Sequence, residues 1–323
     1  MGVLLATVVG LFVAIWTVGA TGWGEIVSVA ARMGLGGLAL VCLYSLGVFA
    51  VLGAAWAAAA GEPAARVGVF AWGRLVREAA SDLLPFSQIG GIVVSIQTLI
   101  ALGVPRARAN ASFLVDLTTE MASQLLFTLF GLALMASILM GDEAAMLRPV
   151  ILGGTGAMIA FILLAFFGQR ALLSLTRKLA TRFLPGSAAA MVEIERELGT
   201  LYGRHGGVAL AFLLNLAAWT MSGALAWLIL TLVGVPISFW TALSLESLIF
   251  TLRSIAFAIP GGIGVQEAAY ALIGPLFGLS PEAALALALA KRARDLALAL
   301  PTLVVWQAIE ARALVRPVTP PAS

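Results

Sequence analysis

The stretch Met33–Ala60, MGLGGLALVCLYSLGVFAVLGAAWAAAA, decides the class of fold because it contains no charged residue. A helix needs about 20 apolar residues to cross the hydrocarbon core of a bilayer, and this stretch is longer. Of all 323 residues, 61% are hydrophobic and only 11% are charged. A soluble globular protein has about 25% charged residues. Because the alternating strands of a membrane β-barrel are also absent, we predict an all-α integral membrane protein.

Apolar runs elsewhere in the chain predict further membrane spans, so that the expected total is about six. The predicted spans are 3–20, 33–60, 109–140, 148–168, 207–233 and 282–309. The first run lacks a basic n-region, so we interpret it as a span; a cleaved signal peptide is the alternative. Residues 169–206 form an amphipathic cytoplasmic linker or a simple solvated connector. We expect residues 1–323 to be one polytopic membrane domain without a separate soluble domain.

Two hydrophobic regions are interrupted by proline and glycine, which disfavour a continuous helix. Each side of either interruption is too short to cross the bilayer. We therefore predict two re-entrant hairpins, each entering and leaving the membrane on one side, with the broken backbone covered by protein or water. The predicted helix breaks are Pro85, Gly90, Gly91, Pro260, Gly261, Gly262 and Gly264.

The interrupted regions belong to an internal repeat, because a shift of 175 residues carries Pro85 onto Pro260 and Gly103 onto Gly278. The predicted repeats cover about 33–140 and 208–310. The loop 103–108 after the first hairpin is basic, whereas its counterpart 278–282 has no basic residue. Since Lys and Arg accumulate in cytoplasmic loops, the two hairpins should enter from opposite faces. We expect inverted-topology repeats, with both termini cytoplasmic.

Charged residues are predicted deep inside the membrane. At a rise of about 1.5 Å per residue, Lys291 lies about 15 Å inside a helix that starts near Ser280. By the same count Asp116 and Glu120 reach a similar depth. A charge there costs about 3 kcal/mol or more, so these groups should face the protein interior or water. The i,i+4 pairs Asp116–Glu120 and Lys291–Asp295 each share one helix face.

Two interpretations of the deep charges stay open. The charges neutralise one another and hold the helices together, for example Arg294 with Glu267, or they line a polar cavity that receives a charged lipid head group. The candidate substrate-binding residues are Arg253, Gln266, Glu267, Lys291, Arg294, Asp295, Glu246, Asp116, Glu120 and Arg292.

Other kinds of chemistry have little support in the sequence. There is one cysteine, Cys42, and one histidine, His205, so no histidine–cysteine metal site and no Ser–His or Cys–His nucleophilic pair is expected. We expect no cofactor and no metal. The basic residues are scattered through short loops, which does not favour nucleic-acid binding. The oligomeric state is not predicted by the sequence.

The second half of the chain carries a specific resemblance. The run Glu246–Phe257 leads into Pro260-Gly-Gly-Ile-Gly264-Val-Gln266-Glu267, followed by Lys291-Arg-Ala-Arg294-Asp295 and the segment Pro301–Trp306. This pattern resembles the flippase-like family named after the transmembrane region of lysylphosphatidylglycerol synthase, and within it the branch associated with hopanoid biosynthesis. The specific match covers about 240–310. The resemblance implies a multi-pass protein of the bacterial inner membrane that moves or handles lipids.

The sequence therefore predicts a lipid translocase-like protein that binds a membrane lipid, either a hopanoid or an anionic phospholipid, in a polar cavity at the midplane. We do not expect an enzyme. One alternative is an intramembrane lipid-modifying enzyme that uses Glu267 or Asp295 as general acid or base. The other is a scaffold that binds lipid-biosynthesis enzymes and moves no lipid.

Overall fold

The computed structural model describes residues 28, 31–83, 87–138, 156, 188–255 and 264–315 of the chain, and every regular element in these ranges is a helix. The elements of the first half are α3 (Gly34–Ala59), η1 (Ala64–Arg66), α4 (Val67–Leu83), α5 (Ser87–Ala101) and α6 (Arg106–Ile138). The elements of the second half are α8 (Ala188–Gly203), α9 (His205–Leu232), α10 (Phe239–Ile255), α11 (Val265–Ile273), η4 (Gly274–Phe277) and α12 (Pro281–Val315).

Long apolar helices confirm the prediction of an all-α membrane protein. Among the described residues, three helical stretches are long and apolar enough to cross a membrane, namely Gly34–Ala59, Arg106–Met135 and His205–Leu232. Large apolar side chains remain exposed on them; Leu43 is 67% exposed and Leu213 58%. Lipid rather than water is the favourable surroundings for such a surface.

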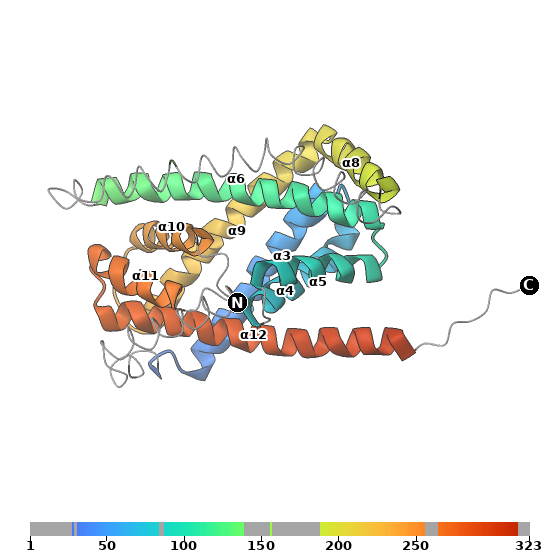
Figure 1. Cartoon of the computed structure of the whole chain (residues 1–323). Helices are drawn as coiled ribbons and strands as arrows, with labels where there is room; N and C mark the ends of the chain where they lie inside the picture. Colours follow the sequence, from blue (N-terminus) through green and yellow to red (C-terminus); the bar gives the residue numbers. More distant parts are fainter. Residues whose placement is uncertain are drawn as a thin grey trace, which may run out of the picture.

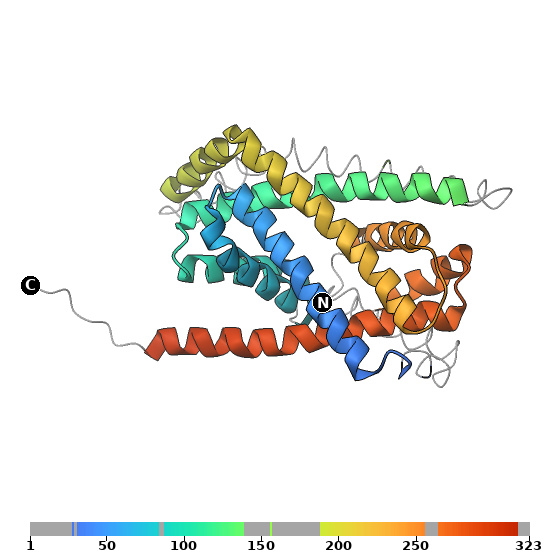
Figure 2. The same cartoon turned by 180° about the vertical axis from the view of Figure 1, so that it is seen from behind.

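The four longest helices set the shape of the molecule. α6 and α12 lie along opposite edges, and α3 and α9 cross between them (Figure 1). The view from behind shows α3 and α9 in front of the other helices (Figure 2), where they pack against each other. Following the colours along the chain, α6 and α12 run in opposite directions in Figure 1, and so do α3 and α9.

Shorter helices fill the space between α6 and α12 in two groups. α4 and α5 pack against each other as a hairpin near the end of the molecule where α6 begins. α10 and α11 lie in contact near the end where α12 begins. Each group also contacts the long helix of the other half, because α4 packs against α12 and α10 packs against α6. The two halves are therefore interlocked.

The prediction that Gly90 and Gly91 break the first hairpin is wrong, since both lie inside α5 (Ser87–Ala101). The physical reason is packing. A Cβ atom on Gly91 would lie 2.2 Å from Ser81 Oγ and 2.5 Å from the Arg77 carbonyl oxygen. Missing side chains let helix backbones approach closely, so Gly91 allows α4 and α5 to touch.

Two glycines shape the backbone just before the long helices. Gly103 precedes α6 with φ +84°, and Gly278 precedes α12 with φ +81°. Positive φ is open to glycine at almost no cost, so these residues can turn the chain out of the preceding helix. Each N–H donates to a carbonyl three residues earlier, from Gly103 to Ile100 and from Gly278 to Pro275.

The loops predicted to be cytoplasmic meet at one end of the molecule. Arg108 Nε donates to Glu197 Oε1 on α8 at 2.7 Å, and its Nη1 donates to Glu62 Oε1 at 3.3 Å. Arg204 Nη1 donates to the Gly61 carbonyl oxygen at 2.8 Å. These bonds tie α8 and the start of α9 to the connection between α3 and α4.

Some predictions fall outside the described residues. They are the spans 3–20 and 148–168, the first half of the linker 169–206, and the helix breaks Pro85, Pro260, Gly261 and Gly262. The second half of the linker contains α8, and Gly264 is the N-cap residue of α11, with φ +82°.

Candidate functional site

The first group of buried charges lies where α4 meets α6 and α9. We name Arg74, Arg77, Asp116, Glu120 and Asn215 the Glu120 cluster; none of them is more than 8% exposed. Arg74 Nη1 donates to Glu120 Oε2 at 2.9 Å, and its Nη2 donates to Glu120 Oε1. Arg77 Nη1 also donates to Glu120 Oε2, at 3.2 Å. Such a two-pronged arginine–carboxylate pair is among the strongest side-chain interactions.

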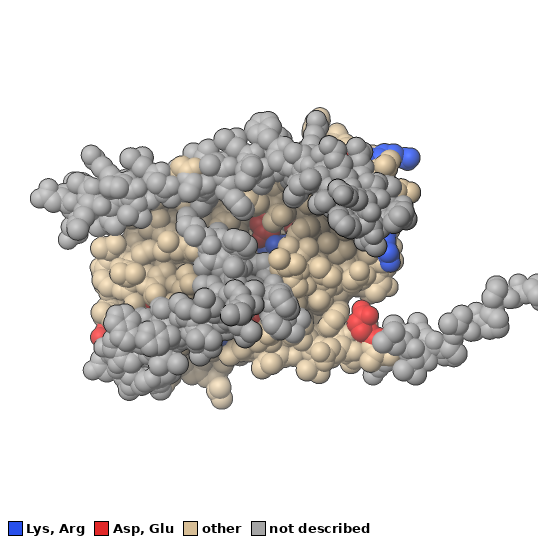
Figure 3. Space-filling view, in the orientation of Figure 1, with Lys and Arg blue, Asp and Glu red and all other residues tan. Residues whose placement is uncertain are grey.

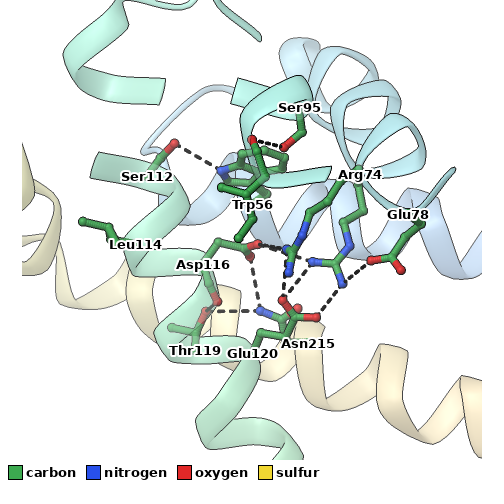
Figure 4. A network of polar contacts seen from close by, with 12 residues as sticks. Trp56, Arg74, Glu78, Ser95, Ser112, Leu114, Asp116, Thr119, Glu120 and Asn215 are labelled. Atoms are coloured by element: carbon green, nitrogen blue, oxygen red, sulfur yellow. Dashed lines mark hydrogen bonds and ion pairs between the residues drawn. The ribbon is translucent and has the colours of Figure 1, made fainter. Parts of the chain in front are cut away.

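Asp116 lies one helical turn before Glu120 and has weaker contacts. Its Oδ1 accepts from Asn215 Nδ2 at 3.4 Å, while Oδ2 is 3.6 Å from Arg74 Nη1 and has no hydrogen-bond partner among the described residues. Figure 4 shows Arg74, Asp116, Glu120 and Asn215 pointing toward one another from α4, α6 and α9. Asn215 Nδ2 also donates to Thr119 Oγ1 at 3.1 Å, which fixes the amide between the two helices.

The second group lies between α10, α11 and α12, and we name Glu246, Tyr270 and Lys291 the Lys291 cluster. All three are at most 2% exposed. Lys291 Nζ donates to Glu246 Oε2 at 2.5 Å and to Tyr270 Oη at 3.0 Å, while Tyr270 Oη donates to Glu246 Oε1. The Lys291 ammonium also lies 5.0 Å from the centre of the Phe250 ring, within the range of a cation–π interaction.

The start of α11 carries a third ion pair. The Gly264 N–H donates to Glu267 Oε2 at 2.8 Å, which caps the helix. Arg292 Nη2 donates to Glu267 Oε1 at 3.2 Å, so α12 is joined to the first turn of α11. Glu267 therefore pairs with Arg292 and not with Arg294, the partner named above as an example of mutual neutralisation. Arg294 Nη2 instead lies 3.0 Å from Oδ1 of its neighbour Asp295.

Arg294 and Asp295 line a small hollow between the two halves. The other charged residues lining it are Glu78 and Asp82 of α4. The Arg294 side chain is 13% exposed, so it is more accessible than Lys291. In Figure 3, acidic and basic atoms are visible near the centre of the face, between α10 and the α4–α5 hairpin. Partly open charges of this kind can exchange one partner for another.

Phe250 lies between the two clusters. Its ring centre is 4.9 Å from that of Trp219, whose Nε1 donates to the Glu120 carbonyl oxygen at 3.3 Å. The same ring faces Lys291 on α12. The two clusters are thus separated by aromatic side chains.

Most predicted site residues fall into these groups, and every one whose side chain is described is buried or partly buried. Gln266 is fully buried, and neither polar atom of its amide has a hydrogen-bond partner in the part of the chain that the structure describes. The backbone of Arg253 belongs to α10, but its side chain lies outside the described residues.

The sequence prediction missed the basic half of the Glu120 cluster. Arg74 and Arg77 lie in a mixed stretch near other charges, and their packing against a distant helix was not expected from the sequence. Their i,i+3 spacing on one helix face was the available signal. Asn215 and Tyr270 lie in largely apolar helices that contain other polar residues, so nothing in their local sequence distinguished them. In the described ranges, no group of three or more His, Cys, Asp or Glu side chains could hold a metal ion.

The fold and these sites define a helical membrane domain whose two halves each pair buried charges between a short helical group and a long helix. The chain belongs to the family described as the lysylphosphatidylglycerol synthase TM region, whose pattern matches residues 3–302. This family is a membrane domain associated with lipid handling. No curated protein and no solved structure matches the chain.

Proposed function

We propose that the protein is a lipid translocase-like membrane protein that binds lipid head groups in its polar interior and exchanges them between leaflets. The observation that carries the proposal is the burial of opposite charges from both halves in the middle of a lipid-handling membrane domain. A charged group at such depth is costly unless it is paired, and it commonly marks a substrate path.

Ion pairs in this interior can open to a head group at limited cost, because the incoming charges replace those that separate. Arg292 and Arg294 are the best candidates, since their side chains are 17% and 13% exposed and, among the described residues, Arg294 pairs with its neighbour Asp295. A planar guanidinium binds phosphate or carboxylate oxygens in pairs. The ligand we propose is a hopanoid derivative or an anionic phospholipid. We propose transport rather than catalysis.

We further propose that the halves are inverted-topology repeats. The shift of 175 residues carries Arg106, where α6 begins, onto Pro281, where α12 begins. It also carries Gly103 onto Gly278, and both have positive φ. The opposite directions of α6 and α12 in Figure 1 agree with this symmetry. Inverted repeats suit alternating access around a midplane site.

The repeat proposal includes a topology in the bacterial inner membrane with both termini cytoplasmic. In a background where Cys42 is replaced by alanine, a cysteine at Arg106 should react with an impermeant reagent from the cytoplasmic side, and a cysteine at Ser280 from the other side. Both positions are exposed loop or helix ends. Labelling of both from one side would refute the inversion.

The function is tested with purified full-length protein in two measurements. Native mass spectrometry should detect a co-purified lipid. In proteoliposomes, a fluorescent anionic phospholipid should become accessible to an impermeant quencher at a rate that depends on the protein. Arg294→Gln should lose most of the co-purified lipid and most of the protein-dependent lipid movement. Arg196→Gln, at an exposed position of α8, should keep both.

Two other results would favour the alternative functions. Chemical conversion of the lipid by the purified protein would indicate an enzyme. Co-purification of lipid-biosynthesis enzymes with no lipid movement would indicate a scaffold.

A further inference from the structure

The Glu120 cluster and its neighbour Glu78 contain an unequal number of opposite charges. Arg74 and Arg77 supply two positive charges, while Asp116, Glu120 and Glu78 supply three carboxylates within 4.0 Å of them. Full ionisation would leave the group with one negative charge in excess, because the partly exposed Glu78 shares Arg74 with the two buried carboxylates and leaves them short of positive charge. An uncompensated buried charge is strongly unfavourable.

The geometry identifies which carboxylate is in excess. Glu120 accepts three guanidinium bonds, and Glu78 lies 3.1 Å from Arg74 with a side chain that is 31% exposed. Asp116 is fully buried, and its Oδ2 is 3.6 Å from Arg74 Nη1 and 4.0 Å from Arg77 Nη1. Those separations are too long for hydrogen bonds. Together with Glu78, the Glu120 cluster becomes neutral if Asp116 carries a proton.

The groups that surround Asp116 leave it without a better counter-charge among the described residues. From α4 it faces Arg74 and Arg77, which are committed to Glu120, and from α9 it faces the neutral Asn215 amide. The polar groups on two other packed helices are already bonded, Trp56 of α3 to Ser112 and Tyr202 of α8 to Thr118. The acid of α10, Glu246, belongs to the Lys291 cluster on the other side of Phe250, where it bonds Lys291. A metal cation at Asp116 would be repelled by the two guanidinium groups. A proton bound to the carboxylate needs no additional space in the buried cluster.

We propose that Asp116 is a proton-binding site that couples lipid movement to the proton gradient; this rests on the proposed translocase function. Asp116 takes a proton from water on one side of the membrane and releases it to water on the other. When it is ionised, it competes with Glu120 for Arg74 and Arg77. Because α4 also packs against α12, a shift of the arginines would move the contact between the two halves.

The proton itself is measured by difference infrared spectroscopy of the full-length protein, which detects the carbonyl band of a protonated carboxylic acid. We expect a band that titrates with pH in the wild type, persists in Glu78→Gln and disappears in Asp116→Asn. The asparagine has nearly the same shape and mimics the protonated state, so the variant should fold. A band that survives in Asp116→Asn, or its absence in the wild type, would overturn the proton site.

The coupling is measured with a fluorescent anionic phospholipid in proteoliposomes with and without an imposed pH gradient. The wild type should accelerate lipid movement several-fold when the gradient is present, and Asp116→Asn should show the same rate in both conditions. Equal gradient dependence in the two proteins would overturn the coupling while leaving the translocase function intact. A titrating Asp116 band with no lipid movement under any condition would overturn the translocase function and with it the coupling, but would support the proton site.

Discussion

Each half of the molecule buries ion pairs between a short helix and a long helix, but the acid and the base lie on opposite helices in the two halves. In the first half, α4 of the hairpin carries the bases Arg74 and Arg77, and the long helix α6 carries the acids Asp116 and Glu120. In the second half, α10 carries the acid Glu246, and the long helix α12 carries the base Lys291. The shared feature is a buried ion pair between a short helix and a long helix, whichever partner is the acid.

The two clusters also differ in the number of charged partners that each buried acid has. Within the described ranges, Glu246 has one cation bonded to it, Lys291, with Tyr270 as the third member. Glu120 has two cations, and those cations have further carboxylates within reach. The halves should therefore respond differently to loss of one charge, which can be measured.

The largest effect is expected from Lys291→Met, which leaves Glu246 fully buried without its cation. Breaking a buried pair by removing one partner typically costs about 3–5 kcal/mol of unfolding free energy. The double variant Lys291→Met with Glu246→Gln should recover most of that loss. Unfolding of the purified variants in detergent by chemical denaturant provides the measurement, and equal losses in the single and double variants would contradict the pairing.

A smaller effect is expected from Glu120→Gln in the first half. Arg74 and Arg77 lose their main partner but can turn to Asp116, so we expect a loss of about 2–3 kcal/mol, consistent with charge-assisted hydrogen bonds. Asp116→Asn should change the stability by less than about 1 kcal/mol, because it removes the carboxylate in excess. If the asparagine variant proved the less stable of the two, the assignment of the excess charge would be wrong.

Gly91→Ala tests the close contact inside the first hairpin. The added Cβ would lie 2.2 Å from Ser81 Oγ and 2.5 Å from a backbone oxygen. Overpacking of this kind costs about 1–3 kcal/mol. Gly47→Ala on α3, where a Cβ meets nothing within 4 Å, is the matched control and should be neutral or slightly stabilising. Thermal unfolding of both variants in the same detergent would compare them directly.

The smallest effect on stability is expected from Arg294→Gln. Its partner is the adjacent Asp295 and its side chain is partly exposed, so the loss should stay below about 1 kcal/mol. Lipid translocation should nevertheless fall sharply, which separates a binding role from a structural one. A large loss of folding stability would instead favour the structural interpretation.

The sequence predicted the location of the deep charges well but not their partners. Helical rise alone indicated that Asp116, Glu120, Lys291 and Asp295 lie far from the ends of their helices, and all four are buried. Which charge meets which depends on how distant helices pack, so the example pair Arg294 with Glu267 could not be distinguished in the sequence from the observed pair Arg292 with Glu267. Arg74 and Arg77 were missed for the same reason.

The role of Gly91 likewise depends on a neighbouring helix and could not be predicted from the local sequence. Gly91 could have served as a helix break or as a contact surface, and the local sequence is compatible with both. Only the position of Ser81 and the Arg77 carbonyl on the neighbouring helix distinguishes them. Gly103 and Gly278 entered the sequence prediction only as matching positions of the repeat, and the structure shows that both have positive φ just before a long helix.

The interlocking of the halves has a consequence for biosynthesis. α10 is synthesised after its partner α6, so it can dock as soon as it enters the membrane. α4 contacts α12, which is the last described helix to leave the ribosome. Trp306 of α12 also donates to Thr98 Oγ1 on α5 at 3.0 Å. Until α12 is synthesised, the face of the α4–α5 hairpin that packs against α12 therefore lacks this partner. A chain that stops before Pro281 should be a target for membrane proteases.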